Sequence, residues 1–203
     1  MTPSEKSNEV LVVLISEYAD WEPSILSPGL RRGFGLWEPR HTVKIVTPDG
    51  APATSIGGFR CQADYSIQTA PDDFAALVLI GGMNWWGEEA KRVLPLVEKT
   101  RERKIAIGAI CDASMFLGVN GFLNDADHTS NGLAALKEKA GVAYTGEARY
   151  KNEPSVLGDA VVTANGAGFI DFACNMFTLL EVADSQTIDS VRAMCKTGFF
   201  PGM

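Results

Sequence analysis

Short apolar runs alternate along this chain with longer stretches that carry apolar residues at helical spacing. Runs rich in β-branched residues predict strands over residues 9–15, 43–46, 75–80, 104–110 and 160–162. Apolar positions three and four residues apart predict helices over residues 23–32, 88–103, 113–119, 133–140, 169–181 and 185–196. Residues 56–65 contain a Gly-Gly turn signal and predict a small hairpin or edge pair.

The alternation of strands and helices predicts an α/β fold, because parallel strands need helical crossovers between them. We expect one domain over residues 1–203, a three-layer α/β/α sandwich of the flavodoxin-like kind with a mainly parallel central sheet. Ligands of such folds bind beyond the carboxyl ends of the strands. Functional side chains are therefore expected in residues 16–22, 81–86, 111–112 and 163–168.

Charge and hydropathy exclude several kinds of partner. The formal net charge of −7 argues against a nucleic-acid partner and against docking on anionic lipid, since both need a basic surface. Apolar runs all fall short of the roughly 18 residues of a membrane-spanning helix, so we expect no membrane partner. The first ten residues lack the apolar core of a signal peptide, which favours a cytoplasmic location.

Cysteine and histidine are both sparse. The four cysteines, Cys61, Cys111, Cys174 and Cys195, form no C-x-x-C pair, and in a cytoplasmic protein we expect them to be reduced thiols. Only two histidines are present, His41 and His128. We therefore predict neither a metal site nor a cofactor, and a mechanism that needs an imidazole has two candidates.

The most informative stretch is KIAIGAICDASMFL, residues 104–117, in which a predicted strand runs directly through Cys111 into a predicted helix. A sharp strand-to-helix turn projects its residue above the sheet, as in a nucleophile elbow. The free N–H groups and dipole of the following helix would stabilise a thiolate there. The alternative is that Cys111 is an ordinary buried thiol, because free cysteines are often packed in cores.

Several motifs around this turn resemble those of one superfamily. The segment Ala-Ile-Cys-Asp-Ala-Ser at 109–114 resembles the cysteine elbow of the ThiJ/PfpI superfamily, which has a class I glutamine amidotransferase-like fold. Further resemblances follow in the same order along the chain, at Asp-Trp-Glu (20–22), Leu-Ile-Gly-Gly (79–82), His-Thr-Ser-Asn (128–131), Thr-Ala-Asn-Gly (163–166) and Asp-Phe-Ala (171–173). The His-Thr-Ser-Asn element resembles that of a bacterial glutamine amidotransferase-like subgroup.

The resemblance implies roles for the residues around Cys111. Glu22 would lie beside the sulfur and, when protonated, donate a hydrogen bond that favours the thiolate; an ionised Glu22 would instead raise the cysteine pKa. The N–H of Gly82, together with the amide of Asp112, would form an oxyanion hole next to Gly81. The alternatives are a solvated acid at a helix start for Glu22 and a simple strand-ending turn for the glycines.

The residue after the cysteine departs from the superfamily pattern. Members that act as Cys–His hydrolases have a histidine there, whereas this chain has Asp112. An aspartate cannot serve as the imidazole base, and its charge disfavours a thiolate. Protease and amidase activity are therefore in doubt, as is true glutamine amidotransferase activity, because no histidine follows residue 128.

Four other residues are candidates for the site. His128 is the histidine with a route to the thiol if its loop turns inward, and its alternative is a surface or supporting role. Asn131 aligns with the position at which deglycase-type relatives carry their histidine. Trp85 and Trp86 follow the two glycines and are candidates for the pocket mouth, although tryptophans more often pack in cores.

These residues favour a cysteine-dependent enzyme in which Cys111 attacks a small electrophile with Glu22 as proton partner. Hydrolase and glyoxalase- or deglycase-like reactions both fit this chemistry. One alternative is a redox or stress sensor that oxidises Cys111, and another is a catalytically inactive binding protein. The partner we expect is a small-molecule substrate, and dimers, common in the superfamily, make a homodimer a further expectation.

Overall fold

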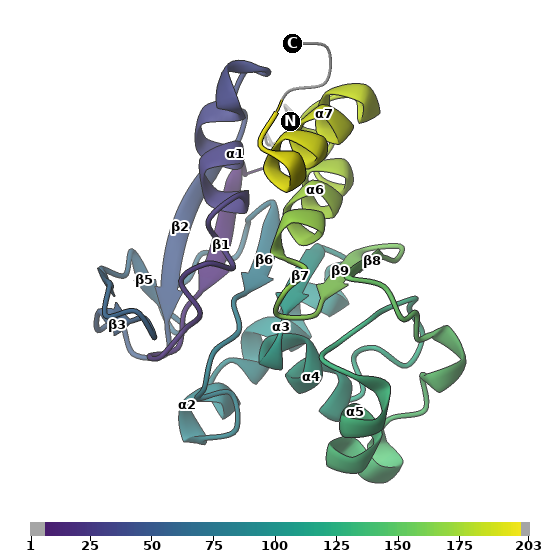
Figure 1. Cartoon of the computed structure of the whole chain (residues 1–203). Helices are drawn as coiled ribbons and strands as arrows, with labels where there is room; N and C mark the ends of the chain where they lie inside the picture. Colours follow the sequence, from purple (N-terminus) through teal and green to yellow (C-terminus); the bar gives the residue numbers. More distant parts are fainter. Residues whose placement is uncertain (1–6, 200–203) are drawn as a thin grey trace, which may run out of the picture.

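The four strands that end near the predicted site are neighbours in the central sheet. The computed structural model describes residues 7–199 and contains a seven-stranded sheet in the order β5-β2-β1-β6-β7-β9-β8 (Figure 1). Its strands are β1 (Glu9–Val13), β2 (Thr42–Thr47), β5 (Tyr65–Ser66), β6 (Ala76–Leu79), β7 (Ala106–Ile110), β8 (Ser155–Leu157) and β9 (Val161–Ala164). All neighbours pair in parallel except β8, which runs antiparallel to β9. The predicted mainly parallel α/β sheet is confirmed.

Helices cover both faces of this sheet. One face is covered by α1 (Leu26–Arg32), α6 (Phe169–Leu179) and α7 (Ser185–Thr197), which lie near one another at the top of Figure 1. The other is covered by α2 (Glu88–Lys91), α3 (Leu94–Glu102) and α4 (Asp112–Val119), against which α5 (Leu133–Ala140) packs. This arrangement gives the three layers of the predicted sandwich.

The apolar run of β1 explains why the strand lies at the centre. Val10 and Val12 pack with α1 and α6, whereas Leu11 and Val13 pack with the helices of the opposite face. Side chains of a strand alternate between the two faces, so a strand covered on both faces reads as a continuous apolar run. All four side chains are buried.

The structure differs from the sequence predictions in three places. The single helix predicted over 88–103 is two helices, because Pro95 lies in the first turn of α3 and has no N–H to continue α2. The hairpin pairs β3 (Ala53–Thr54) with β4 (Arg60–Cys61), so it overlaps the predicted fragment but begins three residues before it. The last residue of the fragment, Tyr65, begins β5 at the sheet edge. The short strand β8 was not predicted.

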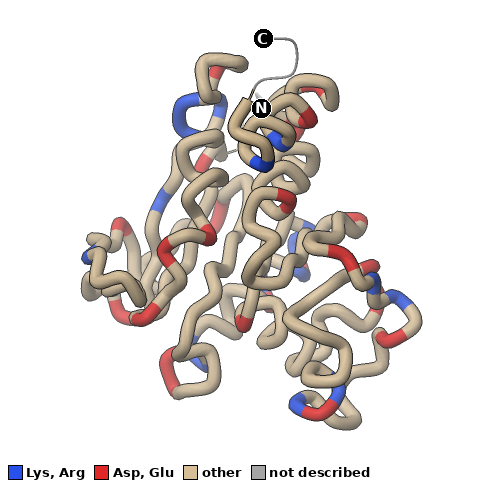
Figure 2. The backbone as a smooth tube through the Cα atoms, in the orientation of Figure 1, with Lys and Arg blue, Asp and Glu red and all other residues tan. Residues whose placement is uncertain are grey.

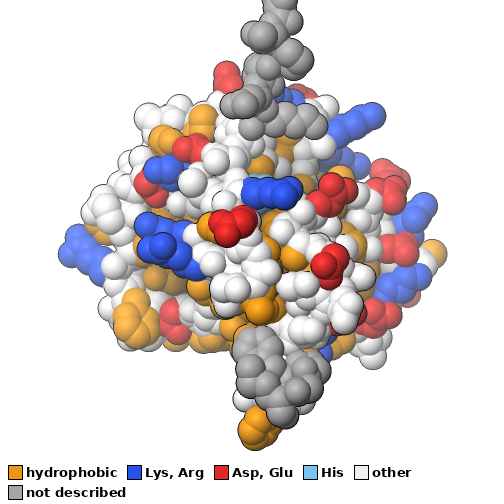
Figure 3. Space-filling model, turned by 90° about the horizontal axis from the view of Figure 1, so that it is seen from above, with side chains coloured by type: hydrophobic (Ala, Val, Ile, Leu, Met, Phe, Trp, Pro, Cys, Tyr) orange, Lys and Arg blue, Asp and Glu red, His pale blue; other side chains and the backbone are white. Residues whose placement is uncertain are grey.

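Charged side chains of both signs are interspersed over the surface, with basic positions at the end of α1 (Figures 2 and 3). Within residues 7–199, each helix is too short or too polar to cross a bilayer. The same residues contain no cluster of histidine, cysteine or acidic side chains that could hold a metal ion.

Candidate active site

Cys111 occupies the sharp turn between β7 and α4. Its backbone has φ 58° and ψ −133°, a conformation that L-residues rarely adopt and that costs on the order of 1–3 kcal/mol. The Cys111 N–H donates to Ala164 O on β9 at 2.9 Å, which fixes the turn to the sheet. The side chain is partly exposed. Strand, strained turn and helix therefore form the elbow expected from the sequence, and Cys111 is not a core thiol.

Glu22 approaches the thiol from the segment between β1 and α1. Its side chain is completely buried, which excludes the solvated acid considered from the sequence. Oε2 accepts a hydrogen bond from the Gly81 N–H at 2.6 Å, whereas Oε1 has no hydrogen-bond partner within residues 7–199. A buried carboxyl oxygen without a partner is costly unless it carries or receives a proton. This oxygen is therefore available to hold a proton beside the thiol.

Two glycines form walls around the thiol and the carboxyl. A Cβ on Gly81 would lie 2.5 Å from Cys111 Cβ and 2.9 Å from Glu22 Oε2. A Cβ on Gly166 would lie 3.0 Å from Cys111 Sγ and 3.7 Å from Glu22 Oε1. A side chain at Gly81 would displace the thiol or the carboxyl, and one at Gly166 would press on the sulfur. The absence of side chains at these positions therefore leaves the space that the two groups share.

Burial controls the protonation of both groups. Burial raises the pKa of Glu22 to about 7, against the hydrogen bond from Gly81 and the influence of the neighbouring Cys111 thiol, and the Asp112 charge adds to the rise. Burial also raises the pKa of the Cys111 thiol to about 11; the Asn131 hydrogen bond lowers it, and the Glu22 carboxylate raises it further. Burial thus favours the protonated form of both the thiol and the carboxyl beside it.

Asn131 and Asp112 connect the thiol to the rim of the site. Asn131 Nδ2 donates to Cys111 Sγ at 3.4 Å and to Asp112 Oδ1 at 2.9 Å, and its Oδ1 accepts from the Gly166 N–H at 3.0 Å. The other Asp112 oxygen accepts from Trp86 Nε1 at 2.9 Å. Both carboxylate oxygens of Asp112 are therefore hydrogen-bonded to neighbouring side chains.

Hydrogen bonds of His128 and Thr129, in the segment that precedes Asn131, hold that segment in position. His128 lies completely buried. Its Nδ1 lies 2.7 Å from Ala126 O, so this nitrogen carries the proton, and Nε2 accepts from the Tyr144 hydroxyl at 2.7 Å. Thr129 N–H donates to Thr163 Oγ1 at 2.7 Å. The structure therefore does not bring His128 to the thiol, because both ring nitrogens already have partners elsewhere.

The two predicted tryptophans have different surroundings. Trp85 is buried against Phe116, and its Nε1 donates to Ile80 O, so it packs in the core and not at the pocket mouth. Trp86 is 36% exposed and reaches Asp112, with the Lys139 ammonium 3.5 Å above its ring centre. The prediction of a rim tryptophan holds for Trp86, and the placement of Trp85 is corrected.

Gly82 lies between the thiol site and the segment before Glu22. Its φ is +149°, and a Cβ there would collide with the backbone of Glu17 and Tyr18. The flanking main-chain bonds run from Ala19 N–H to Gly81 O at 3.0 Å and from Met83 N–H to Glu17 O at 3.1 Å. The Gly82 N–H has no partner among the described residues, and it stays the predicted oxyanion donor.

Sequence reasoning assigned no role to Trp21, Gly166 or Lys139. Trp21, 43% exposed, donates from Nε1 to the carbonyl oxygen of Gly166, which borders Cys111, at 3.0 Å. The Asp-Trp-Glu and Thr-Ala-Asn-Gly elements contained the first two residues, but only the fold shows that they meet. No local pattern marked Lys139 on α5.

Comparisons with known proteins agree with this geometry. A model of the DJ-1/PfpI family matches residues 8–179. The uncharacterized protease YdeA of Bacillus subtilis is 31% identical over 192 residues, covering 95% of this chain and 93% of the relative.

Two solved structures are similar over at least 95% of this chain. A DJ-1 superfamily protein from Agrobacterium tumefaciens has 33% identity and a TM-score of 0.83 over 100% of its chain. A thiJ/pfpI family protein from Bacillus anthracis has 25% identity and a TM-score of 0.88 over 93% of its chain. The assignment to the bacterial subgroup with the His-Thr-Ser-Asn element stays a prediction. The resemblance to the superfamily is confirmed: this chain belongs to the DJ-1/PfpI family.

Proposed function

We propose that this protein is a cysteine-dependent enzyme that acts on small electrophilic carbonyl compounds. Cys111 is the nucleophile and Glu22 its proton partner. The observation that carries the proposal is the buried, unpartnered Oε1 of Glu22 beside a thiol held on a strained elbow. A general base works best when its pKa lies near the working pH, and burial brings Glu22 to about 7.

In this mechanism Glu22 is the general base, the role that histidine has in Cys–His hydrolases. As Sγ bonds to the carbonyl carbon, the thiol proton moves to Glu22 Oε1, so no free thiolate has to form beside a carboxylate. The oxyanion accepts hydrogen bonds from the Gly82 and Asp112 N–H groups. With an ester, the intermediate collapses and the leaving group takes the proton from Glu22. An α-oxoaldehyde has no leaving group; Glu22 returns the proton to the oxyanion and then moves the carbon-bound proton to the neighbouring carbonyl carbon, which also gives a thioester. Water then attacks the thioester, its proton passes to Glu22, and the proton returns to the departing sulfur.

The charges near the thiol favour a neutral substrate. Asp112 lies next to Cys111, and Glu22 is partly ionised at neutral pH, so an anionic substrate would be repelled. The rim consists of the apolar faces of Trp21 and Trp86, whose indole N–H groups already have acceptors. A neutral α-oxoaldehyde or activated ester meets these conditions. Peptide bonds are a further candidate, since YdeA is named a protease.

The raised thiol pKa supports the enzyme over the redox sensor. Oxidation by peroxide starts from a thiolate, and a thiol with a pKa of about 11 provides very little of it at neutral pH. Proton transfer to Glu22 during attack avoids this limit in catalysis. A catalytically inactive binding protein would turn over none of the substrates in the assay below, which distinguishes it from an enzyme.

The test measures turnover of methylglyoxal, p-nitrophenyl acetate and fluorescent casein by the wild-type protein, Cys111→Ala and Glu22→Gln. We expect turnover of at least one neutral carbonyl substrate, lost in Cys111→Ala and reduced about 100-fold or more in Glu22→Gln. Cys195→Ala, which removes a partly buried thiol of α7, is the matched control and keeps full activity. Equal turnover in the wild type and Cys111→Ala, or none of any substrate, would overturn the proposal.

A further inference from the structure

Two buried serine side chains meet beside the main chain of Cys111. Ser114 lies in the first turn of α4, and Ser130 directly precedes Asn131. The Ser114 hydroxyl lies 2.7 Å from Cys111 O and 2.8 Å from the Ser130 hydroxyl. The chemistry proposed at the sulfur uses neither hydroxyl, so this buried polar contact has no role in the mechanism so far.

The two contacts fix the direction of both hydroxyl protons. A carbonyl oxygen can only accept, so the proton of Ser114 points to Cys111 O. The Ser114 oxygen is then the acceptor for the proton of Ser130. Hydrogen bonds that follow one another in this way polarise each other. The serine pair, Ser114 and Ser130, therefore forms one directed chain that ends on the carbonyl of the nucleophile.

The carbonyl of Cys111 and the N–H of Asp112 belong to the same peptide unit. Besides the Ser114 hydroxyl, Cys111 O accepts from the Ser114 N–H at 3.0 Å and from the Met115 N–H at 3.3 Å. This peptide is trans, so its N–H points away from its carbonyl. Because Asp112 is the first residue of α4, no carbonyl of the helix accepts its N–H. The donors on the carbonyl therefore set the direction of a free N–H.

We propose that Ser114 and Ser130 are positioning residues for the oxyanion donor, the Asp112 N–H. Their hydroxyls hold the peptide plane and polarise its carbonyl, which makes the N–H on the same peptide a stronger donor. A donor fixed in advance stabilises the charge that develops in the transition state. This role rests on the acyl transfer proposed for Cys111. Both side chains are buried, so they act through the peptide and do not touch the substrate.

The segment that carries Ser130 contacts the nucleophile at two points. Asn131 donates to Cys111 Sγ at 3.4 Å, and Ser130 reaches the carbonyl of the same residue through Ser114. The Tyr150 hydroxyl donates to Ser130 O at 3.3 Å and holds this part of the segment. One segment thus restrains both the sulfur and the peptide that bears the oxyanion donor.

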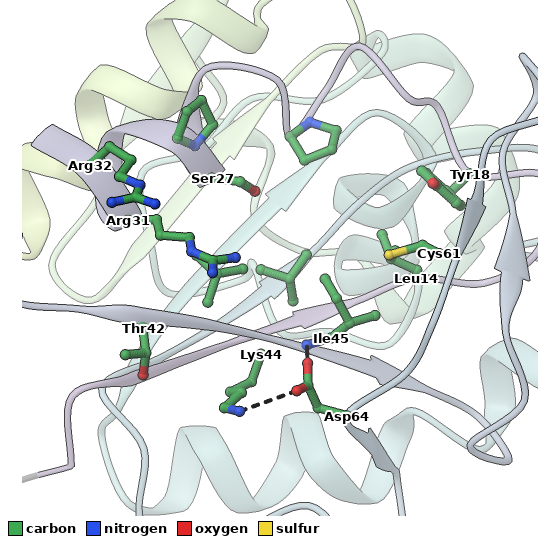
Figure 4. A pocket seen from close by; sticks show the side chains of 14 residues that line it. Leu14, Tyr18, Ser27, Arg31, Arg32, Thr42, Lys44, Ile45, Cys61 and Asp64 are labelled. Carbon is green, nitrogen blue, oxygen red and sulfur yellow. Dashed lines mark hydrogen bonds and ion pairs between the residues drawn. The ribbon is translucent and has the colours of Figure 1, made fainter. Parts of the chain in front are cut away.

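Other helical serines show that these bonds are not a general feature of the chain. Ser27 of α1 is labelled in the groove of Figure 4, and its hydroxyl has no hydrogen-bond partner within residues 7–199. Ser190 of α7 donates to Gln186 O at 2.9 Å, as serines inside helices often do. Ser114 differs because it also accepts a hydrogen bond from another segment, and because its acceptor is the carbonyl of Cys111.

The test compares two reactions of the same thiol. Acylation by p-nitrophenyl acetate passes through an oxyanion, whereas alkylation by iodoacetamide displaces iodide and forms none. We expect Ser114→Ala to slow acylation of Cys111, followed as the burst of p-nitrophenolate, about tenfold and to change alkylation by less than about twofold. Ser130→Ala should slow acylation about threefold and should add nothing in the Ser114→Ala background, because it acts through Ser114.

Ser190→Ala is the matched control, because it removes a hydroxyl that donates to a helix carbonyl away from the thiol, and both rates should stay unchanged. Equal slowing of acylation and alkylation in Ser114→Ala would reveal a general structural role and overturn the assignment, as would unchanged acylation. If Ser114→Ala does not fold, Ser130→Ala, which keeps Ser114, decides by the same comparison. A wild-type protein that is alkylated at Cys111 but never acylated refutes the proposed enzyme itself.

Discussion

Glu22→Gln should make the protein more stable at neutral pH while removing its activity. A carboxyl whose pKa is higher in the folded state binds more protons there than in the unfolded chain. The stability that this extra proton binding gives the folded state is fully present below the ordinary carboxyl pKa of 4.5. It is lost as the pH rises through the folded-state pKa of about 7. One pKa unit corresponds to about 1.4 kcal/mol, so ionised, buried Glu22 costs the wild type about 3 kcal/mol at pH 8.

Glutamine avoids this cost because it is never charged, and its amide oxygen can still accept the hydrogen bond from Gly81. The free energy of unfolding of Glu22→Gln, relative to the wild type, should therefore increase by about 3 kcal/mol between pH 4 and pH 8. In a chain of this length that difference corresponds to roughly 6–12 °C in Tm. Urea unfolding, followed at half-unit intervals of pH, measures it directly.

The matched control is Glu98→Gln, which removes an exposed carboxyl on α3 that has no ion pair within the described range. Its stability relative to the wild type should vary little with pH. A Glu22→Gln difference that is equally constant across the range would refute the reasoning, because it would mean that burial does not raise the pKa of this carboxyl.

Three further changes test the surroundings of the thiol. Asn131→Ala removes the donor to Cys111 Sγ, so the thiol pKa should rise and iodoacetamide labelling at pH 9 should slow about tenfold; an unchanged rate contradicts this role. Gly81→Ala places a Cβ 2.5 Å from that of Cys111, so it should lower the free energy of unfolding by about 3 kcal/mol in denaturant titrations. A loss below about 0.5 kcal/mol would show that the structure around Gly81 can shift to accommodate the methyl group. Trp86→Phe keeps a ring at the rim but loses the hydrogen bond to Asp112, so it should cost about 1 kcal/mol by the same assay, whereas no change would make that bond dispensable.

The elbow and the layers of the fold could be predicted because they depend on local sequence. A buried strand that runs directly into a helix leaves one residue at the turn, and the alternation of apolar runs with helical spacing defines the α/β class. Glu22 and the glycines after β6 follow from the same logic, since the carboxyl ends of neighbouring parallel strands meet at one edge of the sheet.

The remaining errors concern contacts between distant residues. Trp85 and Trp86 are adjacent and chemically identical, and only the surrounding helices decide that the first packs on Phe116 while the second reaches Asp112. His128 could not be excluded from the site until Tyr144, sixteen residues later, was seen to occupy its second nitrogen. Strands of two or three residues, such as β5 and β8, are too short to show a periodicity.

The glycine walls around Cys111 limit how the site can be altered. Where side chains line a cavity, substituting smaller ones enlarges it, but Gly81 and Gly166 have nothing left to remove. Directed evolution of this scaffold can therefore not make room beside the sulfur by trimming these walls. New substrate ranges would have to come from the rim, where Trp21 and Trp86 are large, half-exposed and open to replacement.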